Sequence, residues 1–356
     1  MKSLVMKYKL ICLLISASLL VACEKDPIDT KGNAISFNNS PARAAKVEAP
    51  NDNARMWAYY YNTDNSTTIT KMVYGTESAP ELATLSNINT TEGTASLTVN
   101  GNTKYWFVGT YNFFSIYSDD FKNGNLSDAT LNTSTHTLTF NYDIINQKEL
   151  RYATALNEDG GNAITSDGAS NRTDPVELNY KHLLSKIKFQ GFSTDASNPI
   201  TVTKVEISSI PRQAKVSLKI ADATGIDTKS LTAIYDKVGT STGLTTENNS
   251  GWVCDKDNGY VVFEKMVFPQ SVTATTENPE GQTIPDGAVK FTVTYNTSSE
   301  TGKTKSAFLP SSTWEAGKSY LYKFKIQPSG PIIFGGVSVT DWSVQPETEF
   351  DFPTEP

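Results

Sequence analysis

Short runs in which apolar and polar residues alternate recur along most of the chain. Alternation with a period of two is the pattern of a strand with one buried face. The clearest runs cover residues 135–142, 200–207, 214–220, 289–295 and 320–326. Turn-forming residues separate the runs, as at Asn100-Gly101, which is a typical hairpin signal. Many short strands with turns between them predict β-sandwiches rather than a parallel sheet.

A different apolar stretch lies at the start of the chain. Residues 10–21 are mostly apolar, and three lysines precede them. These twelve residues are too few to cross a bilayer, which takes roughly 20, but they fit a signal peptide. Leu20, Ala22 and Cys23 resemble a bacterial lipobox, which implies cleavage between Ala22 and Cys23 and acylation of the Cys23 thiol. The alternative is an ordinary secretory signal with a chance cysteine at its end.

The segment after this leader contains one short strand and one isolated arginine. Residues 24–32 are charged and turn-rich, which favours a solvated tether, and they resemble the export signal of Bacteroidetes surface lipoproteins. Ile35 and Phe37 alternate with polar neighbours, so both are expected on one face of a strand. A loop of small residues follows, in which Arg43 precedes Ala44.

Charge and cysteine content exclude several classes of protein. The formal net charge is −7, and loss of a leader with three lysines and no acid takes it to −10. An acidic chain argues against nucleic acid, whose phosphates need a basic surface. Outside the leader the cysteines are Cys23 and Cys254, so no disulfide can form within the chain once Cys23 is acylated. We expect Cys254 to be a small buried apolar residue.

No group of residues predicts an enzyme, a cofactor or a metal site. The two histidines are His136, expected on the solvent face of a strand, and His182, expected to be structural near a domain junction. Two histidines in unrelated contexts offer little for a catalytic triad or a metal centre. Asp255 and Asp257 resemble the start of a calcium loop, but position 266 is Met where a Glu is needed.

The 334 residues that remain after a 22-residue leader predict two domains. We predict a signal peptide at 1–22, a lipid-anchored tether with the first strand and a cleavage loop at 23–45, an N-terminal sandwich at 46–177, and a C-terminal sandwich at 178–356. The closing stretch, residues 332–344, is expected to supply pairing surface at or beyond the edge of its domain. The alternative is an ordinary core strand.

Five short motifs follow one another from the middle of the chain to its end. They lie at residues 147–153, 176–189, 267–271, 314–324 and 339–342. The first has the form Gln-x-Asp-Leu, with Glu149 in place of Asp. The second has the form Phe-x-His-x-x-Ser-Lys-Ile-x-Phe, with Tyr180 in place of the first Phe. In this order the motifs resemble the fimbrillin-like pilins of Bacteroidetes, the subunits of type V pili.

The resemblance implies an all-β fold of two tandem transthyretin-like β-sandwiches and a structural role rather than catalysis. It also implies a lipoprotein precursor at the cell outer membrane, with other pilin subunits and an arginine-specific surface protease as partners. Arg43-Ala44 looks like the protease site, with Arg55 as the fallback. Cleavage would release the strand that carries Ile35 and Phe37, and a neighbour's strand would replace it. The motifs do not distinguish stalk, tip and anchor subunits.

Two other functions are compatible with this composition and would place the aromatic or acidic residues differently. A non-polymerising surface lipoprotein that binds glycans or host ligands would expose a planar row of Trp and Tyr, whereas a pilin would bury these rings between sheets. A surface hydrolase would need a cleft with convergent acids, and the sequence offers no such set.

Overall fold

The computed structural model describes residues 33–38, 51–62, 69–89, 94–107, 109–121, 126–159, 172–195, 197–220, 231–238, 242–277, 279–280, 283–327 and 329–342. These residues form β-strands, as the alternating runs predict, and include no α-helix. The described part accordingly contains no helix suited to spanning a membrane. The predicted signal peptide, with Ala22 and Cys23, and the predicted cleavage residues Arg43 and Ala44 lie outside the described residues.

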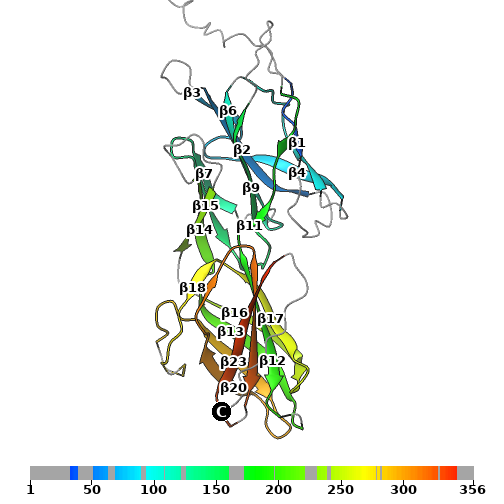
Figure 1. Cartoon of the computed structure of the whole chain (residues 1–356), viewed down its shortest axis with the longest axis vertical. Coiled ribbons are helices and arrows are strands. Elements are labelled where there is room, and N and C mark those ends of the chain that lie inside the picture. Colours follow the sequence, from blue (N-terminus) through cyan, green and yellow to red (C-terminus); the bar gives the residue numbers. More distant parts are fainter. Residues whose placement is uncertain are drawn as a thin grey trace, which may run out of the picture.

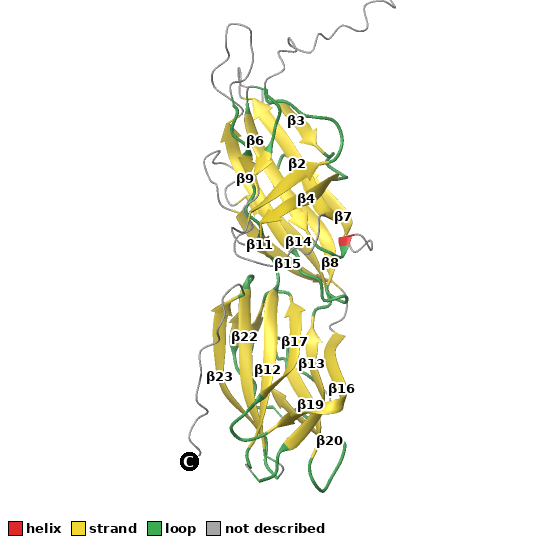
Figure 2. Cartoon of the chain, turned by 90° about the vertical axis from the view of Figure 1, so that its right-hand side faces the viewer, coloured by secondary structure: helices red, strands yellow, loops and turns green. Residues whose placement is uncertain are grey.

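The larger strands form two pairs of sheets that lie end to end along an elongated molecule (Figures 1 and 2). In the first sheet pair, the larger sheet is antiparallel, and β3 (Ile69–Tyr74) joins it by pairing with β2. The other strands of this sheet run in the order β11 (Lys181–His182), β9 (Arg151–Asp159), β6 (Thr110–Tyr117), β2 (Asn51–Asn62), β4 (Glu81–Asn89) and β5 (Thr94–Val99). The facing sheet has the order β15 (Leu231–Val238), β14 (Gln213–Ile220), β8 (Thr137–Asp143) and β7 (Leu126–Asn132).

The second sheet pair consists of two four-stranded sheets. One has the order β17 (Tyr260–Val267), β12 (Ser185–Ser193), β22 (Lys318–Ile326) and β23 (Ile332–Asp341). The other has the order β16 (Thr242–Cys254), β13 (Ile200–Ile210), β19 (Lys290–Asn296) and β20 (Lys303–Phe308). Two short ladders complete the fold: β1 (Phe37–Asn38) with β10 (Val176–Glu177), and β18 (Gln270–Val272) with β21 (Ser312–Trp314).

The hairpin β14–β15 belongs to the first sheet pair although it follows β12 and β13 in the chain. β14 pairs with β8 along its length, with Gln213 opposite Asp143 and Lys219 opposite Thr137. The buried face of β14, which includes Val216 and Leu218, then enters the first core. The predicted division at residue 177 therefore does not separate the two sheet pairs, because a hairpin from the predicted C-terminal domain completes the first pair.

Aromatic side chains fill the cores between the facing sheets. In the first sheet pair, Trp57 and Phe114 are fully buried. In the second, the ring centroid of Phe189 lies 4.7 Å from that of Phe291 and 5.3 Å from that of Tyr322. Rings at these separations attract one another beyond the gain from burial alone. Large rings thus fill both cores, and in the second sheet pair the contact between Phe189 and Phe291 joins the two sheets.

Candidate functional site

The centre of the seven-stranded sheet is buried on both of its faces. Every residue of β6 from Tyr111 to Tyr117 is buried. Phe114 points into the core shared with the facing sheet, whereas Phe113 belongs to a third core on the opposite face. In the described part of the chain, short segments rather than a full sheet cover this opposite face, and residues 33–38 are one of them. An apolar sheet face therefore depends on a few short segments for its cover.

Residues 33–38 lie in what we call the first-strand slot, between residues 104–106 on one side and β10 on the other. The Ile35 N–H donates to the Lys104 carbonyl (2.9 Å), and the Trp106 N–H donates to the Asn33 carbonyl (3.0 Å). On the other side the Val176 N–H donates to the Ser36 carbonyl (2.8 Å), and β1 pairs parallel with β10. Without residues 33–38, both walls of the slot would present unpaired backbone groups.

The two predicted strand residues fill the floor of this slot. Ile35 is buried, and Phe37 packs against the same third core. The Phe37 ring lies 5.6 Å from Tyr74 and meets Phe113 edge-on at 5.7 Å, measured between centroids. Ser36, between them, is exposed. The sequence did not identify the walls of the slot, because contacts with residues 104–106 and β10 join distant parts of the chain.

Arg55, the fallback cleavage residue, lies inside β2 rather than in a loop. Its guanidinium donates to the carbonyls of Ala54 (3.0 Å) and Phe121 (3.4 Å) and lies 5.6 Å from the centre of the Phe121 ring. A protease needs an extended, accessible segment, so this half-buried arginine in a central strand is a poor substrate.

Several motif residues meet at the junction between the two sheet pairs. The Gln147 side chain donates to the Met266 carbonyl (3.1 Å) and accepts from the Met266 N–H (2.7 Å). The Ser185 hydroxyl donates to the Glu315 carbonyl (2.8 Å). Gly317 has a φ of +74°, a left-handed conformation that favours glycine, and its N–H donates to a carbonyl of the same junction. These contacts join the end of the first sheet pair to the start of the second.

A stacked pair of rings closes the junction on one side. His182 and Trp342 stack with centroids 4.6 Å apart and planes at 8°. The Lys186 ammonium lies 4.8 Å from the centre of the Trp342 ring, within cation–π range. His182 Nδ1 contacts the Glu149 carboxylate, which also pairs with Arg151 at 2.6 Å. His182 is therefore structural and lies at the junction, as the sequence predicts.

Comparison with known proteins places this arrangement in a family. The sequence profile of the fimbrillin-like proteins matches residues 43–342. The chain belongs to the fimbrillin-like family. The structure is similar to that of a fimbrial protein from Bacteroides vulgatus, with 14% identity, a TM-score of 0.51, and coverage of 87% of this chain and 100% of that chain. No match was found among curated proteins.

A second solved structure similar to this fimbrillin-like chain is that of the tip fimbrial protein Mfa3 from Porphyromonas gingivalis. It shows 13% identity, a TM-score of 0.40, and coverage of 87% of this chain and 99% of that chain. At such identities a likeness concerns the fold alone. Membership of the fimbrillin-like family supports a pilin-like protein of the cell surface and agrees with a structural rather than a catalytic role.

Glu149, which contacts both Arg151 and His182, is expected to stabilise this fimbrillin-like protein. Burial alone would raise the pKa of Glu149, but hydrogen bonds from Arg151 and His182 outweigh it and lower the pKa to about 2. Stability from this carboxylate is present above its unfolded pKa of 4.5 and is lost as the pH falls towards 2. We expect Glu149→Gln to lower the free energy of unfolding at pH 7 by about 2 to 3 kcal/mol.

Urea unfolding of both forms between pH 7 and pH 2.5 measures this effect, and the difference between them should shrink as the pH falls. Glu264→Gln is the control, because Glu264 pairs with Lys186 at 3.1 Å with 48% of its side chain exposed. Such an exposed ion pair contributes about 0 to 1 kcal/mol to the free energy of unfolding. Equal losses for the two variants, or a loss at Glu149 that does not depend on pH, would contradict this account.

His136 corrects one expectation, since it lies in a turn before β8 rather than in a strand. The Thr135 N–H donates to the Asn132 side chain (2.9 Å), and His136 has a φ of +51°, so the chain bends before the strand begins. The imidazole stacks on Tyr59 and contacts the Tyr59 hydroxyl, to which Asn112 donates (3.0 Å). Partial burial lowers the pKa of His136, which favours the neutral ring.

Cys254 is a buried free thiol, as the sequence predicts. Burial raises the pKa of the thiol to about 11, so little thiolate is present at neutral pH. The described residues contain no group of three or more His, Cys, Asp or Glu side chains that could hold a metal ion.

Proposed function

We propose that this chain is a structural subunit of a cell-surface fimbria that is exported as a lipoprotein and polymerises by donor-strand exchange. In this proposal residues 1–22 are a signal peptide, Cys23 carries the lipid, and the two sheet pairs are transthyretin-like sandwiches in tandem. The observation that carries the proposal is the first-strand slot, where a short segment near the start of the chain covers an apolar sheet face and pairs on both sides.

The energetics of the slot favour exchange once the loop after it is cut. Burial of Ile35 and Phe37 is worth about 1.5 to 3 kcal/mol each, and each backbone hydrogen bond adds about 0.5 to 1.5 kcal/mol. A neighbour's strand would make similar contacts, so the tethered strand is retained through its high effective concentration. An arginine-specific surface protease that cuts Arg43-Ala44 removes this advantage and opens an edge for another chain.

The last strand offers a second pairing surface. β23 is the edge strand of its sheet: one side pairs with β22, and no strand pairs with its other side in the described part of the chain. Phe334 and Val337 pack against the second core, whereas Val339 is 50% exposed. β23 is thus part of its own domain and also presents a free edge, which supports its proposed use in subunit contact.

The burial of the aromatic rings weighs against the alternative, a non-polymerising lipoprotein that binds glycans. Trp57, Trp106 and Trp314 are at most 1% exposed. Among the described residues, Phe107 and Tyr260 are the strongly exposed aromatic side chains, and they lie in different sheet pairs. A stacking platform needs several exposed rings in one row, so we retain the pilin as the proposed function.

Replacement of the proposed lipid attachment site tests export. Several acyl chains, at about 0.8 kcal/mol per buried CH₂, would anchor the precursor stably. We expect Cys23→Ala to lose acyl labelling, to fail to reach the surface, and to form no filaments recognised by an antibody to this chain in electron microscopy. The wild type should show labelled filaments. Acyl labelling that persists in the variant, or a wild-type cell surface without labelled filaments, would contradict the proposal.

A further inference from the structure

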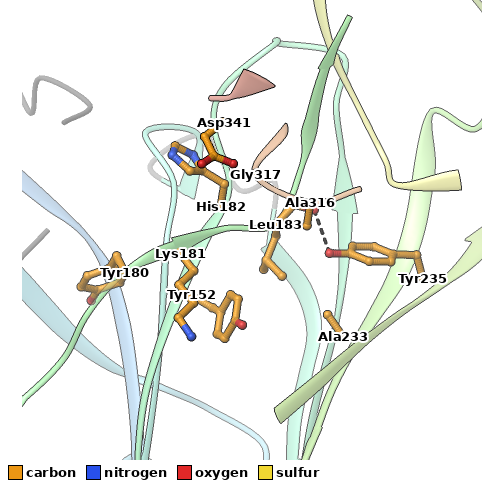
Figure 3. A pocket seen from close by; sticks show the side chains of 10 residues that line it. All are labelled: Tyr152, Tyr180, Lys181, His182, Leu183, Ala233, Tyr235, Ala316, Gly317 and Asp341. Atoms are coloured by element: carbon orange, nitrogen blue, oxygen red, sulfur yellow. Dashed lines mark hydrogen bonds between the residues drawn. The ribbon is translucent and has the colours of Figure 1, made fainter. Parts of the chain in front are cut away.

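A pocket of about 360 Å³ lies at the junction between the two sheet pairs (Figure 3). Both pairs contribute to its wall. The first pair and the connection that follows it supply Tyr152, Lys181, Leu183, Ala233 and Tyr235, and the second pair supplies Ala316, Gly317 and Asp341. The volume falls within the range of pockets that hold a small ligand or a large side chain.

The pocket has an aromatic wall and one unpaired positive charge. The Tyr235 hydroxyl donates to the Leu183 carbonyl (2.8 Å), which leaves the faces of Tyr235 and Tyr152 as apolar wall (Figure 3). Asp341 is neutralised by Lys318, whose ammonium lies 2.6 Å from it. Lys181 is exposed and forms no ion pair within the described residues. The pocket therefore suits an apolar ring that has a carboxylate beside it.

The C-terminal segment of the chain, which begins next to the pocket, contains an aromatic ring flanked by carboxylates. Asp341 lines the pocket, the Trp342 N–H is held by the Gly317 carbonyl (2.9 Å), and 14 further residues follow. These residues include no Lys or Arg, and Phe350 stands between Glu349 and Asp351. The acidic residues of this segment are Glu347, Glu349, Asp351 and Glu355.

The length of this segment allows it to return to the pocket. The eight residues from 343 to 350 span at most about 27 Å when extended. Pro346, followed by a polar pair, favours a turn that reverses the chain on the way. A phenylalanine ring buries on the order of 150 to 250 Å² in such a pocket. Because the segment is tethered beside the pocket, its effective concentration there is high.

We propose that residues 343–356 dock back onto the junction, with Phe350 in the pocket and its flanking acids beside Lys181. The C-terminal segment then bridges the two sheet pairs of its own chain. This inference does not depend on fimbrial assembly, because docking takes place within one isolated molecule.

Photo-crosslinking of the full-length monomer tests the docking. A benzophenone amino acid at position 350 keeps an aromatic side chain there, and mass spectrometry locates the products. We expect crosslinks within one chain to residues 181–183 and 233–235. Lys181→Glu should lower their yield by about two- to fivefold, the effect of losing a surface ion pair.

Lys215→Glu is the matched control, since Lys215 is an exposed lysine on β14 that does not line the pocket. It should leave the yield unchanged. Crosslinks spread evenly over the surface, or equal losses in the two lysine variants, would overturn the proposal. Products found only between two chains would also overturn it, because they would assign the pocket to the segment of a second copy.

Discussion

Arg43→Ala is expected to abolish fibre assembly and to leave the chain as a lipidated monomer on the cell. The residues of the first-strand slot remain in place in this variant, so the tethered strand competes with every incoming strand at high effective concentration. In the wild type, N-terminal sequencing of filament-associated chains should give Ala44 as the first residue. Filament counts by electron microscopy and the mass of the extracted chain measure the two outcomes.

Arg43→Lys distinguishes a requirement for cleavage at this position from a requirement for its positive charge. An arginine-specific protease does not cut after lysine, so this variant should fail to assemble just as Arg43→Ala does. If Arg43 were only a solvated loop charge, the lysine variant would assemble normally. Assembled wild-type filaments whose chains still begin at Cys23 would rule out the exchange mechanism for this protein.

Phe37→Ala is expected to have the opposite effect and to accelerate exchange. It removes the ring contacts with Tyr74 and Phe113 while the backbone hydrogen bonds of the slot remain. For a half-buried ring we expect a loss of about 2 kcal/mol in the retention of the strand, which corresponds to about a thirtyfold faster release. The rate at which the N-terminal fragment dissociates from purified, protease-cut protein measures this change.

Ser36→Ala is the control for that experiment, because Ser36 is exposed and uses its backbone carbonyl rather than its side chain in the slot. Its release rate should equal that of the wild type. An unchanged rate for Phe37→Ala would show that the ring contacts do not hold the strand. Circular dichroism of the uncut variant distinguishes faster release from general unfolding.

Burial patterns within single strands could be predicted from the sequence, because a period of two is a local property. The run at 214–220 became β14, and Ala214, Val216 and Leu218 face the core as its alternation requires. The alternation at 135–142 predicts a strand that begins two residues before β8 does, because the Asn132 side chain accepts a hydrogen bond from the Thr135 N–H and the chain turns at His136. A competing local hydrogen bond is not visible in hydrophobic periodicity.

Partners between distant segments could not be predicted in the same way. Ile35 and Phe37 could be recognised as one face of a strand, but nothing near them in sequence indicates that Lys104 and Val176 form the walls around them. Likewise, Gln147 belongs to a recognisable motif, but the backbone of Met266 that it binds lies far along the chain. The motifs pointed to the family but did not reveal the contacts that their residues make.

The crossing of β14 and β15 into the first sheet pair also limits the order in which the two sheet pairs can fold. A chain that emerges N-terminus first presents β8 long before β14, since Asp143 and its partner Gln213 are 70 residues apart. During that interval the edge of β8 is open to aggregation with other emerging chains. The first sheet pair cannot close until β12 and β13, which belong to the second, have also emerged. The two sheet pairs therefore have to fold together, and the edge of β8 stays open throughout this delay.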